Sequence, residues 1–200
     1  HNRVRRQRQM CIRDSHQVVV QDFVSGAMEN TTATVHGDFL HQTSREIIDG
    51  GNESIIAHEL FHHWFGDLVT CESWSNLPLN ESFANYSQYL WDEFEYGKME
   101  ADKNAFQEME VYFLSAQQGC YKDLVRFDYK DNEDMFDGHS YNKGGRILHM
   151  LRDYLGDSAF FDALNFYLIK HAYQTTEAHD LRMAFELSLI HISEPTRLGA

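Results

Sequence analysis

The feature that most constrains this chain is a pair of histidines, His58 and His62, which enclose Glu59 in a His-Glu-Leu-Phe-His run. On an α-helix, histidines at this spacing lie on one face about one turn apart, so both imidazoles can bind a single metal ion. A catalytic zinc takes three protein ligands and keeps a fourth position for water. Glu81 can complete such a set, and Glu59 is then free to act as a base.

The pattern of apolar residues predicts that the histidines lie on a helix over 52–65, with Asn52 as its N-cap and Gly66 as its C-terminal stop. Apolar side chains leave this helix hardly any polar face, so we expect it to be buried. A second helix is predicted over about 79–96, with Glu81 in its first turn. A helix-loop-helix of this kind can return the Glu81 carboxylate to the histidine pair.

The rest of the sequence predicts a mainly helical α+β domain with a small sheet. Runs rich in β-branched residues predict strands over 17–24 and 31–36. Apolar stripes predict four further helices, over about 100–118, 141–155, 157–171 and 177–186. The acidic, turn-rich segment 128–138 is expected to be a solvated loop.

Both ends of the chain are predicted to be foreign to the protein. Residues 5–15 and 187–197 can be back-translated into a transposase-based sequencing adapter, in opposite orientations. We therefore expect residues 1–15 and 187–200 to be adapter-derived and residues 16–186 to be biological. The alternative is a natural basic N-terminal arm and a natural C-terminal tail. A segment of roughly 170 residues can build one hydrophobic core, and open ends on both sides suggest a piece of a larger protein.

Charge limits the partners. The whole chain carries 17 Lys and Arg against 31 Asp and Glu, a net charge of −14. Leaving out the terminal segments gives 11 against 29, or −18, which argues against binding to nucleic acid or to an anionic membrane surface. No apolar run reaches the roughly 20 residues that span a bilayer. Outside the terminal segments the cysteines are Cys71 and Cys120, which can pair or stay free, so the compartment stays open.

Four short segments follow one another along the chain. They read GAMEN at 26–30, HELFHHWFGDLVT at 58–70, NESFA at 80–84 and YNKG at 141–144. Their order and separations resemble the gluzincin aminopeptidases of the aminopeptidase N and leukotriene hydrolase family. In that family the segments are the exopeptidase motif, the zinc helix with its following strand, the third-ligand motif and the region of the catalytic tyrosine. Ser82 is a departure, because the family commonly has glycine there.

The resemblance implies an incomplete thermolysin-like zinc metallopeptidase catalytic domain, from a longer parent protein that is a zinc aminopeptidase. His58, His62 and Glu81 are expected to bind one Zn²⁺ per chain. Glu59 is expected to be the general base toward water, and Tyr141 to donate a hydrogen bond to the oxyanion. The expected substrates are peptides with a free N-terminus.

The resemblance also assigns substrate binding to one motif, which consists of Gly26, Ala27, Met28, Glu29 and Asn30. The carboxylate of Glu29 can pair with a free α-ammonium group, a contact that an internal peptide bond does not offer. The backbone at Gly26 and Ala27 lacks bulk, so a substrate can lie alongside it as an added strand.

Other assignments are open. The same scaffold carries an epoxide-hydrolase activity in the family, and related domains that have lost zinc ligands serve as non-catalytic scaffolds. Tyr129 is a weaker rival of Tyr141 for the oxyanion. On a helix, His63 points about 100° away from the predicted ligand His62, and it is expected to be structural. Cys71 is expected to pack and not to bind metal.

Overall fold

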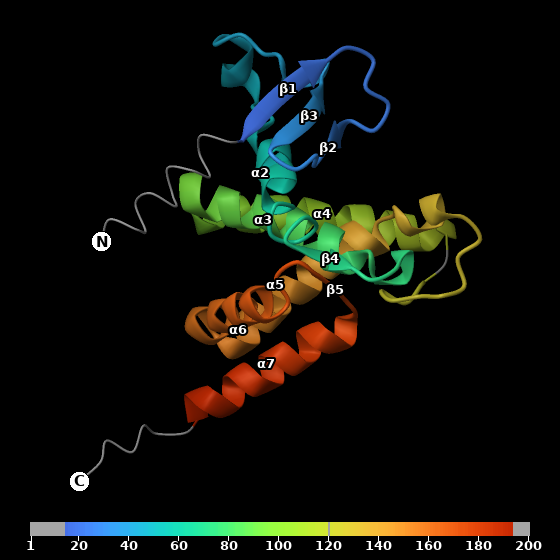
Figure 1. The fold of residues 1–200 in the computed structure, drawn as a ribbon. Coiled ribbons are helices and arrows are strands. Elements are labelled where there is room, and N and C mark those ends of the chain that lie inside the picture. The colour runs from blue at the N-terminus through green and yellow to red at the C-terminus, as the bar shows by residue number, and fades with distance from the viewer. Residues whose placement is uncertain (1–14, 120, 194–200) are drawn as a thin grey trace.

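The computed structural model describes residues 15–119 and 121–193. Figure 1 shows a small sheet at one end of the molecule, a body of packed helices, and α7 at the opposite end. The α+β class is confirmed, because most described residues are helical and the strands are few and short.

The small sheet consists of β1 (His16–Val20), β2 (Ala27–Met28) and β3 (Ala33–Gly37), in the order β1-β3-β2. β1 runs parallel to β3 with Val18 opposite Val35, and β2 runs antiparallel to β3 with Met28 opposite Val35. Among the described residues no strand pairs with the outer edge of β2. The segment 26–30 therefore lies at an open sheet edge.

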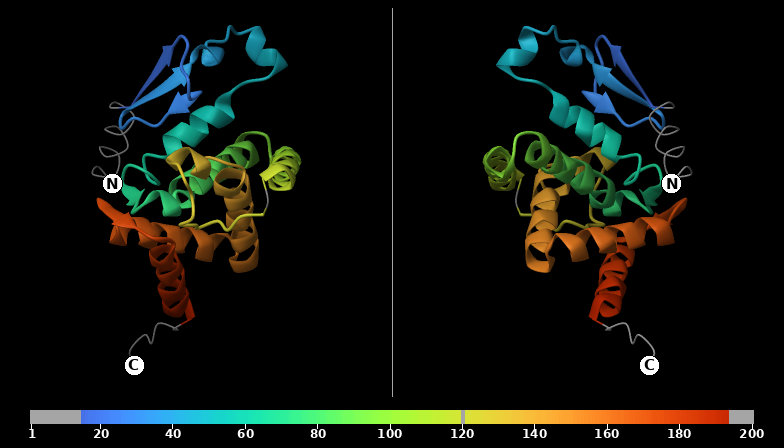
Figure 2. Two further views of the ribbon diagram at one scale, coloured as in Figure 1. Left: turned by 90° about the vertical axis from the view of Figure 1, so that its right-hand side faces the viewer. Right: turned by 90° about the vertical axis from the view of Figure 1, so that its left-hand side faces the viewer.

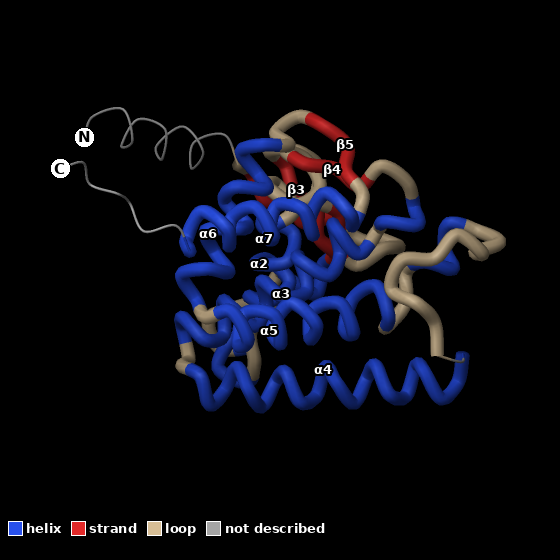
Figure 3. Tube along the Cα trace, turned by 90° about the horizontal axis from the view of Figure 1, so that it is seen from below, coloured by secondary structure: helices blue, strands red, loops and turns tan. Residues whose placement is uncertain are grey.

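The helices are α2 (Glu53–Phe61), α3 (Pro78–Glu95), α4 (Lys98–Gly119), α5 (Gly144–Leu155), α6 (Asp157–Lys170) and α7 (Ala178–Ser193). α3 lies at the centre, since α2, α4 and α5 all pack against it, while α6 packs between α5 and α7. Figure 2 shows α2 leading from the sheet to this helical body, and Figure 3 shows α4 along one side of it.

A second, two-stranded sheet joins distant parts of the chain. β4 (Val69–Cys71) pairs in parallel with β5 (Gln174–Thr176), so Val69 lies opposite Gln174. Parallel strands need a long crossover, which here includes α3 to α6. The segment that follows the histidine helix is thus fixed to the C-terminal part of the domain.

The hydrophobic core lies around α3. Phe65 and Phe83 stack with ring centroids 4.0 Å apart, and Tyr86, Phe160 and Tyr167 are almost completely buried beside them. These residues come from the turn after α2, from α3 and from α6, so burying their rings holds the three segments together. The core therefore fixes the position of α3 beneath α2.

The helix that carries the histidines begins at the predicted position and ends earlier than predicted. It ends at Phe61 and not at Phe65, because the chain continues in tighter turns in which His63 and Trp64 donate to carbonyls three residues back. Asn52 holds the N-cap position, but its side chain forms no capping hydrogen bond, since its amide donates to the Phe39 carbonyl instead.

The prediction that this helix is buried is wrong. Among its own residues only Glu59 is buried. Leu60 in the helix and Trp64 in the turn after it are 42% and 43% exposed, because they line an apolar groove between α2 and α3 that opens to solvent. Within α2, full burial is therefore confined to Glu59.

The other elements follow their predictions with shifted boundaries. α3, α4 and α6 lie within two residues of the predicted ranges, whereas β1 ends at Val20 because the chain turns at Gln21. Residues 141–143 belong to a π-helix over His139–Lys143, and α5 begins only after it. The 128–138 loop contains the completely buried Met135, so it is only partly solvated.

At the C-terminal end of the described residues, α7 continues to Ser193, into the segment predicted to derive from an adapter. The adapter origin of that segment stays a prediction. Most of the corresponding N-terminal segment, together with Cys120, lies outside the described residues. Of the helices in the described part of the chain, none combines the length and the apolar character needed to cross a membrane.

Candidate metal centre

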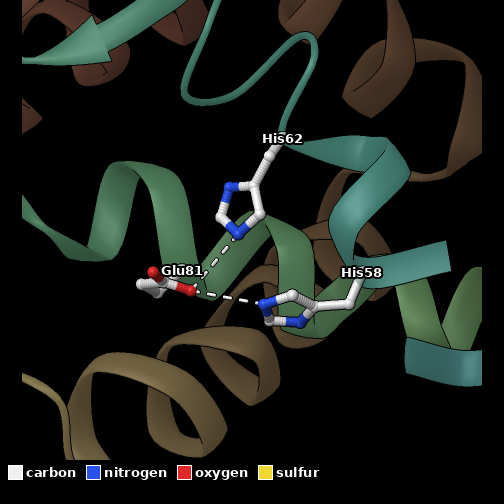
Figure 4. A group of neighbouring side chains, drawn as sticks. All are labelled: His58, His62 and Glu81. Atoms are coloured by element: carbon white, nitrogen blue, oxygen red, sulfur yellow. Dashed lines mark hydrogen bonds and ion pairs between the residues drawn. The ribbon is translucent and has the colours of Figure 1, made fainter. Parts of the chain in front are cut away.

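α2 and α3 bring the three predicted ligands together. Figure 4 shows the imidazoles of His58 and His62 directed at one carboxylate oxygen of Glu81. That oxygen, Oε2, lies 3.3 Å from Nε2 of His58 and 3.4 Å from Nε2 of His62. The histidines extend from one side of α2, and Glu81 comes from the first turn of α3.

These separations fit a zinc ion. Ligands about 2.1 Å from a tetrahedral centre lie about 3.4 Å from each other, which is the spacing of Glu81 to each histidine. The three ligand atoms all lie within 4.8 Å of one another. Two imidazole nitrogens and one carboxylate oxygen are also the donor set of open catalytic zinc sites.

A hydrogen bond fixes which nitrogen His62 presents. Its Nδ1 lies 3.0 Å from the backbone carbonyl of Phe65, which can only accept, so Nδ1 carries the hydrogen. In the neutral imidazole, which is the form that binds a metal, the lone pair is then on Nε2, the atom that faces Glu81. Outer contacts of this kind orient metal-binding histidines in general.

Gly66 makes this turn possible. Its φ is +151°, and a Cβ at this position would lie 3.0 Å from the His62 carbonyl. The chain can therefore fold back closely enough for the carbonyl of Phe65 to reach the imidazole of His62.

The polar start of α3 is held in place. Asn80 accepts a hydrogen bond from the backbone N–H of Cys71 in β4, at 3.2 Å.

Burial alone would raise the pKa of the Glu81 carboxyl, but hydrogen bonds from His58 and His62 outweigh it and lower that pKa to about 2. Burial tends to lower the pKa of His62, yet Glu81 raises it to about 9, so without a metal Nε2 also carries a proton, which metal binding would release. Glu81 is therefore a carboxylate at neutral pH, as a zinc ligand must be.

Glu59 lies on the buried side of α2 between the two histidines. Burial raises the pKa of its carboxyl to about 7, against the lowering effect of His58 and His62. Oxygen atoms of Glu59 and Glu29 and a nitrogen of His62 all lie within 4.8 Å of one another. A carboxyl with a pKa near neutrality and close to the ligands is suited to proton transfer.

The segment 26–30 forms one wall of the same cleft. Ala27 and Met28 make up β2, and the carboxylate of Glu29 just beyond them lies 4.0 Å from Nδ1 of His62. Gly26, with φ +80°, and Asn30 form the turns before and after this short strand and do not line the cleft. The motif thus brings Glu29 to the metal ligands.

The cleft itself has a volume of about 880 Å³. Besides the ligands, Glu59 and Glu29, it is lined by side chains from β4 and the turn after it, among them Cys71 and Trp74. This volume is in the range of small-molecule and peptide sites. The three predicted metal ligands, the predicted base Glu59 and Glu29 therefore all line one cleft.

Tyr141 also lines this cleft. Its ring is parallel to that of His58, with centroids 5.9 Å apart and an angle of 8° between the planes. Burial, followed by the negative charge of Glu81, raises the pKa of its hydroxyl far above the usual value. The hydroxyl is therefore protonated and can donate. Tyr129, the rival tyrosine, does not line the cleft.

The sequence did not identify Asp137, which holds the segment that carries Tyr141. Its carboxylate accepts from the backbone N–H groups of His139 and Ser140 and pairs with Arg126 at 2.9 Å. An aspartate that accepts from the backbone N–H groups two and three residues later is a common capping pattern, so a signal was present. It was masked by the acidic composition of the surrounding segment.

His63 and Cys71 lie beside the ligands without joining them. His63 Nε2 accepts from the backbone N–H of Thr32, at 3.2 Å, which connects α2 to the start of β3. Cys71 belongs to no group of potential metal ligands in the described residues. Both placements agree with structural roles.

Comparison with known proteins settles the family. The model of the peptidase family M1 domain matches residues 7–193. This chain belongs to peptidase family M1. The M1 domain described here is 35% identical over 170 residues to endoplasmic reticulum aminopeptidase 1 of Homo sapiens and 35% identical over 179 residues to aminopeptidase N of Streptomyces lividans.

These alignments cover 81% and 85% of this chain but only 18% and 21% of the two relatives. The M1 chain thus spans about a fifth of the length of the curated relatives it matches. Its fold is also similar to the crystal structure of a mutant M1 zinc metallopeptidase from Deinococcus radiodurans bound to a Tyr-Ser-Ala substrate. That similarity has a TM-score of 0.70 at 24% identity, over 88% of this chain and 36% of the other.

Proposed function

We propose that the full-length protein is a zinc aminopeptidase that hydrolyses the first peptide bond of peptides with a free N-terminus. The observation that carries this proposal is the position of Glu29, whose carboxylate lies 4.0 Å from a zinc-ligand imidazole in the cleft that also contains Glu59 and Tyr141. The names of the relatives, which are aminopeptidases, support the same activity.

His58, His62 and Glu81 would hold the ion. A bound zinc supplies a positive charge that acidifies water and polarises a carbonyl group. Glu59 accepts the proton of the attacking water and delivers it to the nitrogen of the leaving amine. Its burial, which raises its pKa to about 7, suits it to both transfers.

Tyr141 acts on the other side of the scissile carbonyl. As the peptide carbonyl becomes tetrahedral, its oxygen gains negative charge, and the buried hydroxyl of Tyr141 donates a hydrogen bond to it. Since the ring is packed parallel to His58, the donor is already in place before the charge develops. Such a preorganised donor contributes about 3 kcal/mol to transition-state stabilisation.

Glu29 gives the proposed preference for chain ends. Its carboxylate can pair with the α-ammonium group of a substrate whose first carbonyl lies at the metal ligands. β2 leaves its outer edge open, so the substrate backbone can add to it as a short strand.

The test compares free and N-acetylated peptides on the full-length protein with zinc bound. We expect cleavage of the free peptide only, because acetylation removes the charge that Glu29 binds. Glu29→Gln should raise KM for the free peptide by roughly tenfold or more, as expected for the loss of a charge-assisted hydrogen bond. Glu72→Gln is the matched control, because Glu72 lines the same cleft but is exposed. Equal cleavage of both peptides by the wild type would disprove the exopeptidase assignment.

A further inference from the structure

Ser82 provides a direct connection between the helix of the third ligand and the segment of Tyr141. Its side chain is buried, and its hydroxyl donates a hydrogen bond to the backbone carbonyl of Ser140 at 2.7 Å. Ser82 directly follows Glu81 in α3, and Ser140 directly precedes Tyr141 in the π-helix. One hydrogen bond therefore joins the neighbours of two groups that face the cleft.

The two segments touch at this point without any other side chain between them. A Cβ added to Gly144 would lie 1.8 Å from Oγ of Ser82 and 2.5 Å from its Cβ. The backbone at the end of the π-helix thus lies directly on the side chain of Ser82. Because the contact is so close, the hydroxyl has little freedom to choose another partner, and its hydrogen bond fixes the separation of the segments.

The other contacts of the π-helix come from different parts of the molecule. Asp137 binds its first N–H groups from the preceding loop, and Asn142 donates to Glu108 of α4. Of the side-chain hydrogen bonds found in the described residues, only the one from Ser82 ties the backbone of the π-helix to α3. π-Helical turns are less regular than α-helices, so their geometry depends on such contacts.

From this arrangement we propose that Ser82 is a positioning residue, which holds the π-helix against α3 so that the hydroxyl of Tyr141 stays directed at the cleft beside Glu81. The proposal rests on the proposed function, in which Tyr141 donates to the oxyanion. Without the Ser82 hydroxyl, the buried carbonyl of Ser140 loses the donor from α3 and the π-helix moves relative to the ligands. Displacing the Tyr141 hydroxyl in this way leaves the affinity for substrate nearly unchanged. It weakens the stabilisation of the transition state.

The first test is kinetic and uses the full-length, zinc-loaded protein. Ser82→Ala should lower kcat roughly three- to tenfold, the equivalent of one buried hydrogen bond, with KM within about twofold of the wild type and an unchanged zinc content. In a Tyr141→Phe background the same substitution should have no further effect, because the hydroxyl that Ser82 positions is already gone. An equal loss of kcat in both backgrounds would overturn the proposal.

Ser87→Ala is the matched control. Ser87 is also a buried serine of α3, but its hydroxyl donates to the Ala84 carbonyl of its own helix, at 2.6 Å, on the side away from the cleft. We expect it to leave kcat unchanged. Ser82→Gly removes the same hydroxyl without adding volume against Gly144, and it should reproduce the effect of Ser82→Ala.

A second measurement does not depend on activity. Amide hydrogen exchange of the segment 136–146 should be faster in Ser82→Ala than in the wild type and unchanged in Ser87→Ala. If the protein is active and its hydrogen exchange is unchanged in Ser82→Ala, the positioning role of Ser82 is overturned and the proposed function is not. An inactive, zinc-loaded wild-type protein would instead overturn the proposed function and with it the role of Tyr141.

Discussion

Glu59 is the residue whose substitution separates the proposed chemistry from zinc binding. It lies between the two histidines but supplies none of the three converging ligand atoms. Glu59→Gln keeps the size and hydrogen-bonding ability of the side chain and removes its ability to accept a proton. We expect kcat/KM of the full-length protein to fall by about 10²–10⁴, while zinc content by metal analysis stays the same. Full activity in this variant would disprove the general-base role.

At the same scale, the sequence predicted which ligating side chains come together, and the structure brings them together. The i,i+4 spacing of His58 and His62 requires only a helix, and Glu81 requires only that the next helix folds back. The hydrogen bond that sets the tautomer of His62 was not predictable. It depends on where α2 ends, and the acceptor, a backbone carbonyl at Phe65, has no sequence signature.

Among the elements, the π-helix depends on the ionised carboxylate of Asp137. Burial tends to raise its pKa, but the Ser140 N–H and the charge of Arg126 lower it below the usual value. A lowered pKa means that the stabilisation is present above the ordinary pKa of aspartate, about 3.9, and is lost as pH falls through the folded value. At neutral pH we expect Asp137→Asn to lower the free energy of unfolding by about 1–3 kcal/mol.

The measurement is denaturant unfolding of wild type and variant at several pH values. The difference between them should be constant near neutrality and shrink below about pH 4, because the wild-type carboxylate then becomes protonated. Asp128→Asn is the control, since Asp128 lies exposed in the same acidic segment. A difference that persists unchanged at low pH would show that Asp137 acts through its shape and not its charge.

The contact between α3 and α5 predicts the effect of a single methyl group. In Gly144→Ala, the new Cβ would overlap the side chain of Ser82, so α5 or α3 must move. We expect a loss of about 1–3 kcal/mol in the free energy of unfolding, measured by denaturant titration. Gly119→Ala, at the end of α4, places its Cβ in open space and should cause no loss. Equal stability of both variants would contradict the close packing of these helices.

The elements were predictable to the extent that they have a periodic pattern. α3 and α6 carry apolar stripes and a clear start or stop, such as Pro78 and Gly156, and their ranges were correct within two residues. β2 and β5 were missed because strands of two and three residues are too short for a pattern. The π-helix was read as the start of α5, since its sequence differs from that of an α-helix in no periodic feature.

On the scale of the whole molecule, zinc would join the two helices at the centre of the fold. His58 and His62 belong to α2 and its end, and Glu81 belongs to α3, so a bound ion cross-links the part that carries the sheet to the helical body. A ligand that binds only the folded state stabilises it, by about 4 kcal/mol at a concentration a thousand times its Kd. Chelation should therefore lower Tm as well as abolish peptide cleavage, and added Zn²⁺ should restore both.

Two histidine variants distinguish this effect from a general one. His62→Ala should remove the Tm difference between zinc-loaded and chelated protein, because it removes a ligand. His63→Ala should keep the difference, since His63 binds the backbone of Thr32 and not the ligand cluster. Scanning calorimetry with and without chelator provides the comparison. A zinc effect that survives in His62→Ala would place the ion elsewhere.

The turn between His62 and Gly66 has a consequence for anyone who recombines domains of this kind. The imidazole of His62 is aimed by a carbonyl three residues later, and Gly66 lets the chain return without a clash. Inserting or deleting one residue there would shift the carbonyl and turn the ring away, although the two histidines would keep their spacing. In chimeras and loop grafts, residues 58–66 therefore have to be exchanged as one block, with the crossover placed before the helix or after β4.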